Sequence, residues 1–191
     1  MGREFELKYQ ANPAVLEVIQ GDFSGFHTIT METTYYDTTD GILGRLHWTV
    51  RRRLENGVSV CTVKTNLPDG SRGEWEVEAA EVAEALPRLV NMGAPEELLS
   101  HCAQGLLPTC GARFTRKAAM VCGGCCELAL DSGVLLGGGK EEPLCEVEVE
   151  QKQGTDEETR RFAQALAEKY HLLPQPKSKL ARARALIPNS K

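Results

Sequence analysis

Six segments of the chain alternate between polar and apolar residues with a period of two, which is typical of β-strands. Asn56-Gly57 separates two of them and favours a tight hairpin turn, so the flanking strands are expected to pair antiparallel. Asp69-Gly70 and Gly123-Gly124 indicate further reversals. The predicted strands cover residues 4–8, 48–54, 58–64, 74–78, 127–131 and 146–150.

Helical signals are fewer than strand signals. Thr155 with Glu158 three residues later forms a capping-box pattern, and the helix it opens is predicted to end near His171. Shorter helices are predicted after Asn12 and after Ser178. Residues 81–99 predict helical pieces interrupted by Pro87, Gly93 and Pro95. These patterns indicate an α+β protein dominated by antiparallel sheet, and 191 residues favour a single domain, 1–191.

Composition and charge narrow the classes of function. Hydrophobic residues make up 41% and charged residues 26% of the chain, which is ordinary for a folded globular protein. The net charge of -5 provides no general basic field, so no nucleic-acid partner is expected and any anion site must be local. Residues 1–10 do not resemble a signal peptide, and no run of about 18 apolar residues occurs, so we expect a cytoplasmic protein without a membrane partner.

Seven cysteines raise the question of a metal site or disulfides. Cys122, Cys125 and Cys126 cluster around Gly123-Gly124, but they provide only one C-x-x-C pair, whereas structural zinc usually needs a second pair or suitably spaced histidines. We therefore favour structural or incidental thiols and keep zinc as the alternative. The four histidines show no ligand or triad spacing, and Trp48 and Trp75 are interpreted as packing residues.

Charged residues follow the strand alternation. In residues 4–8 the carboxylates of Glu4 and Glu6 share one strand face with Lys8, and residues 146–150 again place their carboxylates together. Like charges on one face repel unless a cation lies among them, and Mg²⁺ or Mn²⁺ takes such oxygen ligands. The simpler alternative is the solvated face of an ordinary antiparallel sheet.

Basic residues on other predicted strands favour a cation-binding face over the solvated face of an ordinary sheet. Arg51 and Arg53 share a face, Lys64 lies across the predicted hairpin from them, and Arg72 precedes Glu74. Guanidinium forks and ammonium groups in such a set would neutralise a polyphosphate. If the charged faces point inward, helices or loops must cover the apolar faces from outside, and a wet, charged tunnel results. Further candidates for this tunnel are Asp131, Arg113, Arg116 and Lys117, the last three on a segment of ambiguous register.

At this point the sequence resembles the CYTH domains, also called triphosphate tunnel metalloenzymes. Their hallmark E-x-E-x-K is matched by Glu4, Glu6 and Lys8. An ordered set of further matches covers nearly the whole chain: Tyr35-Tyr36-Asp37-Thr38, Arg51-x-Arg53, Asn56-Gly57, Thr62-Val63-Lys64, Arg72-x-Glu74, Leu130-Asp131, Glu146-x-Glu148 and Ser178-Lys179. The chain departs from the usual pattern at Arg52, where the family more often has an apolar residue.

The resemblance implies an eight-stranded antiparallel β-tunnel, or barrel, with helices packed outside. It implies metal ligands at Glu4, Glu6, Asp131, Glu146 and Glu148. It implies phosphate ligands at Lys8, Arg51, Arg53, Lys64, Arg72, Arg116 and Lys179, and catalytic roles for Lys8, Lys64 and Glu74. Glu74 could also contact a second ion or position water, while Glu76 and Lys177 are secondary candidates.

The expected activity is metal-dependent hydrolysis of inorganic tripolyphosphate to diphosphate and phosphate, because no appended nucleotide-reading or RNA-binding segment is evident. Related activities of the resembled family are the alternatives, namely a class IV adenylyl cyclase or a thiamine triphosphatase. A non-catalytic module that binds polyphosphate or a nucleotide is a third possibility. The expected partner is a small-molecule triphosphate, and the sequence leaves the oligomeric state open.

Overall fold

The computed structural model describes residues 2–3, 5–66 and 72–188. Within this part of the chain, ten strands form one antiparallel sheet in the order β1-β6-β5-β4-β3-β7-β8-β9-β2-β10. Eight strands were expected; the other two, β1 and β10, have two residues each and extend the ends of the sheet. The strands are β1 (Gly2–Arg3), β2 (Glu6–Gln10), β3 (His27–Asp37), β4 (Thr49–Glu55), β5 (Val58–Asn66), β6 (Arg72–Glu78), β7 (Leu107–Val121), β8 (Cys126–Gly137), β9 (Lys140–Gln151) and β10 (Leu173–Pro174).

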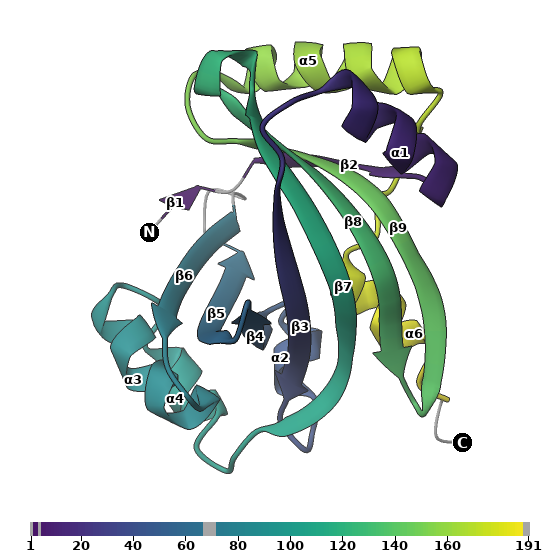
Figure 1. Ribbon diagram of the computed structural model, residues 1–191. Coiled ribbons are helices and arrows are strands. Elements are labelled where there is room, and N and C mark those ends of the chain that lie inside the picture. Colours follow the sequence, from purple (N-terminus) through teal and green to yellow (C-terminus); the bar gives the residue numbers. More distant parts are fainter. Residues whose placement is uncertain (1, 4, 67–71, 189–191) are drawn as a thin grey trace.

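The first strands bring the two sides of the sheet close together. Arg3 pairs with Gly73 in β6, and the carbonyl of Phe5 accepts a hydrogen bond of 2.9 Å from the backbone N–H of Gln151 in β9. Two residues of extended chain span at most about 7 Å. The sheet must therefore curl, and Figure 1 shows its long strands bending around a common interior.

Most helices cover the outer, apolar face of this curved sheet. In one cluster, α1 (Pro13–Asp22) and α5 (Asp156–Tyr170) pack over β2, β8 and β9. In a second cluster, α3 (Val82–Asn91) and α4 (Glu97–His101) pack over β4, β5 and β6, joined by α2 (Ile42–Arg45). In the strands that these helices cover, the apolar side of the alternation packs outward, whereas Ile29, Met31 and Tyr35 of β3 face the interior.

The last helix differs from the expectation of helices outside. Helix α6 (Lys179–Ala185) packs against inward-facing residues of β7 and β8, including Phe114 and Leu135. Gly137 makes this approach possible, because a Cβ at that position would collide with the carbonyl oxygen of Ala183. Helix α6 thus lies on the concave side of the sheet and brings its first residues into the interior.

Turn and cap signals in the sequence are reproduced closely. Asn56 and Gly57, with φ of 50° and 90°, connect β4 to β5, and the Thr155–Glu158 capping box opens α5. Pro87, predicted to interrupt a helix, instead lies inside α3. It costs one backbone hydrogen bond, and burial of Leu86 and Leu89 on either side holds the helix together. Asp69-Gly70 lies outside the described residues.

None of the helices in the described ranges combines the length and apolarity of a membrane span.

Candidate functional site

A cavity of about 300 Å³ lies on the concave side of the sheet. All strands from β2 to β9 and the start of α6 contribute to its lining. Among the described residues, eight cations and seven carboxylates line it, so its charges nearly balance without any bound ion. The cations are Lys8, Arg51, Arg53, Lys64, Arg72, Arg116, Lys152 and Lys179, and the carboxylates are Glu6, Glu55, Glu74, Glu76, Glu127, Glu148 and Glu150.

One side of the cavity is rich in cations. Strands β4, β5 and β6 carry what we call the cation wall: Arg51, Arg53, Lys64 and Arg72. Every second residue of a strand faces inward, which explains why Arg51 and Arg53 share the cavity while Arg52 pairs outside with Glu81 at 3.7 Å.

Carboxylates hold the cation wall in place. Glu74 lies directly opposite Lys64 in the strand register, with 3.0 Å between ammonium and carboxylate, and also contacts Arg51 at 3.3 Å. Arg72 donates a hydrogen bond of 3.1 Å to the hydroxyl of Thr49. Burial, followed by the charge of Arg51, lowers the pKa of Arg53 below its ordinary value. These cations are therefore crowded and partly desolvated, which favours an incoming anion.

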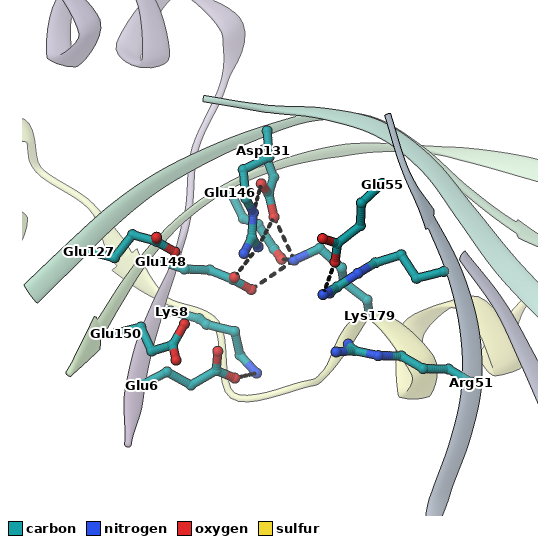
Figure 2. Close-up of polar contacts among 12 residues, drawn as sticks. Glu6, Lys8, Arg51, Glu55, Glu127, Asp131, Glu146, Glu148, Glu150 and Lys179 are labelled. Carbon is teal, nitrogen blue, oxygen red and sulfur yellow. Dashed lines mark hydrogen bonds and ion pairs between the residues drawn. The ribbon is translucent and has the colours of Figure 1, made fainter. Parts of the chain in front are cut away.

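The other side is rich in carboxylates. Strands β2, β8 and β9 carry the acid wall: Glu6, Glu127, Asp131, Glu146, Glu148 and Glu150. Figure 2 shows Glu6, Glu127 and Glu150 across the interior from Arg51 and Glu55. A cation-rich surface and an acid-rich surface therefore face each other across one cavity.

Three carboxylates of the acid wall form a buried cluster. Asp131, Glu146 and Glu148 each place an oxygen within 4.8 Å of the others, and Asp131 and Glu146 are fully inaccessible to solvent. The ammonium of Lys179 lies 2.8 Å from Asp131 and 2.7 Å from Glu148, and it also contacts Glu146. The guanidinium of Arg116 forms a two-pronged pair with Asp131 at 2.8 and 2.7 Å and contacts Glu148.

Burial and pairing push the pKa values of Glu146 and Glu148 apart. Burial disfavours the ionised form of Glu148, yet Lys179 and Arg116 outweigh burial and hold its pKa well below the usual range. Burial raises the pKa of Glu146 above the usual range, because Lys179 and Arg182 only partly offset it. Glu148 is thus the carboxylate of this pair that stays ionised most firmly, and Glu146 the one that accepts a proton more readily.

A second row of carboxylates crosses the acid wall nearer the start of β8. Glu6 lies opposite Glu150, and Glu150 lies opposite Glu127, on three neighbouring strands. Lys152 compensates this row, with its ammonium 2.9 Å from Glu150 and 3.7 Å from Glu127. The ammonium of Lys8 lies 3.1 Å from Glu6.

The predicted site residues come together in this cavity, with two of them set behind its lining. Asp131 and Glu146 contact Lys179 but do not line the cavity themselves, and Glu4 lies outside the described residues. The predicted residues that line the cavity are Glu6, Lys8, Arg51, Arg53, Lys64, Arg72, Glu74, Arg116, Glu148 and Lys179.

The pairing of β7 with β8 defines the register of residues 113–117, which was ambiguous in the sequence. Arg116 lies opposite Asp131 and faces the cavity, whereas Arg113 is exposed and pairs with Glu141 at 2.6 Å. Lys117 donates to the side chain of Gln20 in α1, on the outer face.

Sequence reasoning did not single out Glu55, Glu127, Glu150 and Lys152 as site residues. Two of them could have been found, because Glu150 shares the face of Glu146 and Glu148, and Glu127 shares that of Asp131. Lys152 follows the end of β9, where alternation gives no guide to side-chain direction.

The chemistry of the acid wall suits a hard divalent cation. Buried carboxylate oxygens within 4.8 Å of one another are the donor set that Mg²⁺ and Mn²⁺ accept. Lys179 lies among these oxygens, so its ammonium and a divalent cation would compete for the same charge. The buried cluster is therefore consistent with a divalent-metal site.

Among the described residues, the two aromatic residues that line the cavity, Tyr35 and Phe114, are buried, with exposed fractions of 5% and 7%. The Arg116 guanidinium and the Lys179 ammonium lie 6.0 and 5.2 Å from the centre of the Phe114 ring. Trp75 is buried in the outer core and Trp48 packs against His101, with ring centres 5.6 Å apart.

Comparisons with solved structures show similar overall folds. HpAC1 from Hippeastrum, a candidate adenylyl cyclase with a dominant triphosphatase activity, has a similar fold, with 18% identity, a TM-score of 0.68 and 95% of each chain covered. The PH1819 protein from Pyrococcus horikoshii OT3 is 21% identical, with a TM-score of 0.65 over 94% of this chain and 97% of that one. A candidate adenylate cyclase from Bacillus halodurans is 18% identical, with a TM-score of 0.65 over 93% and 96% of the two chains.

The family comparison covers almost the whole chain. The CYTH domain matches residues 2–183, which include both walls of the cavity and the residues of α6 that enter it. This chain therefore belongs to the CYTH domain family, whose members handle triphosphates.

Proposed function

We propose that this protein is a metal-dependent triphosphatase that hydrolyses inorganic tripolyphosphate to diphosphate and phosphate inside a closed β-tunnel. The observation that carries the proposal is the cation wall facing the acid wall across a single cavity of about 300 Å³. A metal complex of a triphosphate presents an anionic chain on one side and a divalent cation on the other. The two walls complement these two sides.

The cations of the cavity are suited to hold the phosphate chain. In the cation wall, Arg51 and Lys64 are engaged with Glu74, and Arg53 contacts Glu55. A triphosphate would take over these charge-assisted hydrogen bonds, the arginines with paired donors and the lysines with single charges. Lys8, Arg72, Arg116 and Lys179 complete the proposed set.

Carboxylates of the acid wall are suited to hold the metal. Glu6, Asp131, Glu146 and Glu148, with Glu4 from the sequence pattern, would bind Mg²⁺ or Mn²⁺, which supplies neutralisation of charge on the phosphate oxygens. Lys179 would then move its ammonium from these carboxylates to a phosphate oxygen. Metal binding and substrate binding would therefore favour each other.

Three residues are proposed to assist the chemical step. Glu74, whose carboxylate lies 3.0 Å from the Lys64 ammonium, would orient the attacking water and accept its proton once the substrate has drawn Lys64 to a phosphate oxygen. Lys64 and Lys8 would stabilise charge on the phosphate oxygens as the bond breaks. The protein would contribute mainly positioning and charge neutralisation.

The cavity favours an inorganic triphosphate over a nucleotide. Its polar lining consists mostly of charged groups, and the Phe114 ring already lies beside Arg116 and Lys179. An adenine base would need an uncovered ring face or a set of neutral hydrogen-bonding groups. We therefore expect little discrimination in favour of a purine.

The proposal is tested by phosphate release from tripolyphosphate, ATP and thiamine triphosphate in parallel, with Mg²⁺, with Mn²⁺ and with chelator. Fast metal-dependent release from tripolyphosphate is expected, and Arg116→Ala should abolish most of it. Arg113→Ala, three residues away on the same strand but exposed, is the matched control and should retain it. Cyclic nucleotide formed from ATP, or tight binding without release, would contradict the proposal.

A further inference from the structure

A second chemically distinctive region lies in the turn between β7 and β8, whose cysteines do not line the cavity. Residues 122–126 read Cys-Gly-Gly-Cys-Cys, so three of the seven cysteines fall within five positions. Cys122 is exposed, Cys125 is half-buried and Cys126 is buried. The group thus pairs a solvent-accessible thiol with thiols sheltered from solvent.

The backbone of this turn folds the first thiol back on the last. Cys122 has a φ of 52°, followed by 65° at Gly123 and 95° at Gly124. A positive φ is uncommon for cysteine, and such strained positions cluster at functional sites. The N–H of Cys125 donates to the carbonyl of Cys122 at 3.3 Å, and Cys126 lies directly opposite Val121 in the strand register.

The thiols of Cys122 and Cys126 are neighbours. Burial raises the pKa of Cys122, and the adjacent Cys126 and Cys125 thiols, including a side-chain hydrogen bond with Cys126, raise it further. Cys126 also lies 3.5 Å from the hydroxyl of Thr159 in α5. In the reduced protein, the side chains of Cys122 and Cys126 therefore interact.

Geometry limits which pairs can bridge. Consecutive Cα atoms are about 3.8 Å apart, below the separation of about 4.4 Å that a disulfide usually requires, so Cys125 and Cys126 are not a suitable pair. Cys122 must then be one partner, and its side-chain hydrogen bond with Cys126 favours that thiol over Cys125. A preformed metal site is not supported, because Asp131, Glu146 and Glu148 are the sole group of three or more ligating side chains found among the described residues.

We infer that Cys122 and Cys126 form a reversible disulfide, a modification site in the β7–β8 turn. With a low-molecular-weight disulfide such as oxidised glutathione, the Cys122 thiolate attacks one sulfur, and reduced glutathione leaves with a proton. The Cys126 thiolate then attacks the Cys122 sulfur of the mixed disulfide and releases the second glutathione. The two protein thiols are oxidised, and one glutathione disulfide is reduced to two thiols.

The turn is connected to one end of the charged cavity. The carbonyl of Cys125 accepts hydrogen bonds from the N–H groups of Lys152 at 2.9 Å and Gln153 at 3.0 Å. Glu127, which follows Cys126, and Lys152 both line the cavity and lie 3.7 Å apart through their charged groups. A disulfide that draws Cys122 onto Cys126 would disturb the carbonyl that anchors Lys152.

The inference is tested by equilibrating the full chain in glutathione buffers of increasing oxidised fraction, followed by acid quenching, alkylation of free thiols and peptide mass mapping. The peptide that contains residues 122–126 should carry one alkyl group in place of three, with two cysteines joined at the cost of two hydrogen atoms, and excess reduced glutathione should restore the fully alkylated peptide. Persistence of free thiols, or of a mixed disulfide alone, in the most oxidising buffer would overturn the inference.

Single serine variants identify the partners. Cys122→Ser at the exposed position should abolish the bridge with little effect on folding, and Cys125→Ser should retain it. Cys126→Ser should also abolish it, but this position is buried, so its fold is checked by circular dichroism. A bridge that survives Cys126→Ser and disappears in Cys125→Ser would overturn the assignment of Cys126. Thiols protected by stoichiometric zinc in purified protein would overturn the redox interpretation.

The expected effect of the disulfide on the cavity rests on the proposed function, and a separate binding measurement tests it. The oxidised protein should bind tripolyphosphate about threefold to tenfold more weakly than the reduced protein in titration calorimetry, because one of its lining cations is displaced. Cys122→Ser should show no difference between the two buffers. Equal affinity of the oxidised and reduced forms would overturn the link to the cavity, while the disulfide itself is read from the masses and does not depend on triphosphate binding.

Discussion

Lys179, at the first position of α6, places its ammonium 2.7 Å from the carboxylate of Glu148 in β9. The two residues are separated by 31 positions, and the contact is nearly excluded from solvent. Burial disfavours the charge of Lys179, yet Asp131 and Glu148 raise its pKa well above the ordinary value. Lys179 therefore acts as a built-in counter-ion of the acid wall.

Lys179→Met should leave the acid wall short of a cation. Breaking a buried ion pair by removing one partner should lower the free energy of unfolding by about 3 kcal/mol. Urea denaturation measures this loss, and Mg²⁺ should restore more stability to the variant than it adds to the parent protein. Lys177→Met, at an exposed position two residues earlier, is the control and should behave as the parent does.

Arg53→Ala and Arg52→Ala should separate the two faces of β4. Arg53 lines the cavity, whereas Arg52 pairs outside with Glu81. Loss of one charge-assisted hydrogen bond to phosphate should raise the KM for tripolyphosphate about tenfold or more in Arg53→Ala. Arg52→Ala should change it less than about twofold, since surface ion pairs contribute little. Equal effects of the two substitutions would contradict the inward role of Arg53.

Glu6→Gln should weaken metal-supported turnover while the fold is retained. The substitution keeps the size of the side chain but removes a charged oxygen ligand from the acid wall. The Mg²⁺ concentration for half-maximal activity should rise about tenfold or more. Glu141→Gln, exposed on β9, provides the comparison. Unchanged turnover in Glu6→Gln would remove that carboxylate from the proposed ligand set.

Glu148→Gln tests the pH dependence of the buried cluster. Because the folded-state pKa of Glu148 lies below its unfolded value, its ionised form contributes stability above the ordinary glutamate pKa of about 4.3. That contribution is lost as the pH falls through the folded-state pKa. The variant should therefore be less stable than the parent at neutral pH by about 3 kcal/mol, and the difference should shrink in strong acid. Thermal unfolding of both proteins across the acid range measures this convergence.

The contribution of Glu146 to stability should change with pH in the opposite direction. Its folded-state pKa is raised above the unfolded value, so its ionisation costs stability as the pH rises through that interval. Glu146→Gln should consequently destabilise the protein less than Glu148→Gln at neutral pH. A larger loss in Glu146→Gln would contradict the described charge states.

Much of the sheet and of the site could be predicted from alternation alone. A strand that alternates charged and apolar residues, such as residues 146–150, has one packing solution, with valines outward against α5 and carboxylates inward. The Asn56-Gly57 turn fixed the pairing of β4 with β5, and so brought Arg51 and Lys64 to one surface. For residues 146–150 and the Asn56-Gly57 turn, the local sequence was sufficient to predict side-chain direction and strand pairing.

The strands β3 and β7 were harder to find. Residues 27–37 contain threonines and tyrosines on both faces, and burial alternates clearly only in their second half. The long β7 is recognisable once β3 and β8 lie on either side of it, because its register depends on both partners. Likewise, nothing local to α6 indicates that Lys179 enters the interior; that position follows from its packing against Gly137 and Phe114.

The pairing of β2 with β9 also has a consequence for how the chain is made. Leu7 in β2 finds its partner Val149 more than a hundred positions later, so a chain leaving the ribosome carries β2 unpaired until β9 has emerged. During that interval the apolar side of β2 lacks α5, and its charged side lacks the lysine that neutralises the acid wall. Translation speed and nascent-chain chaperones should therefore influence the yield of this protein.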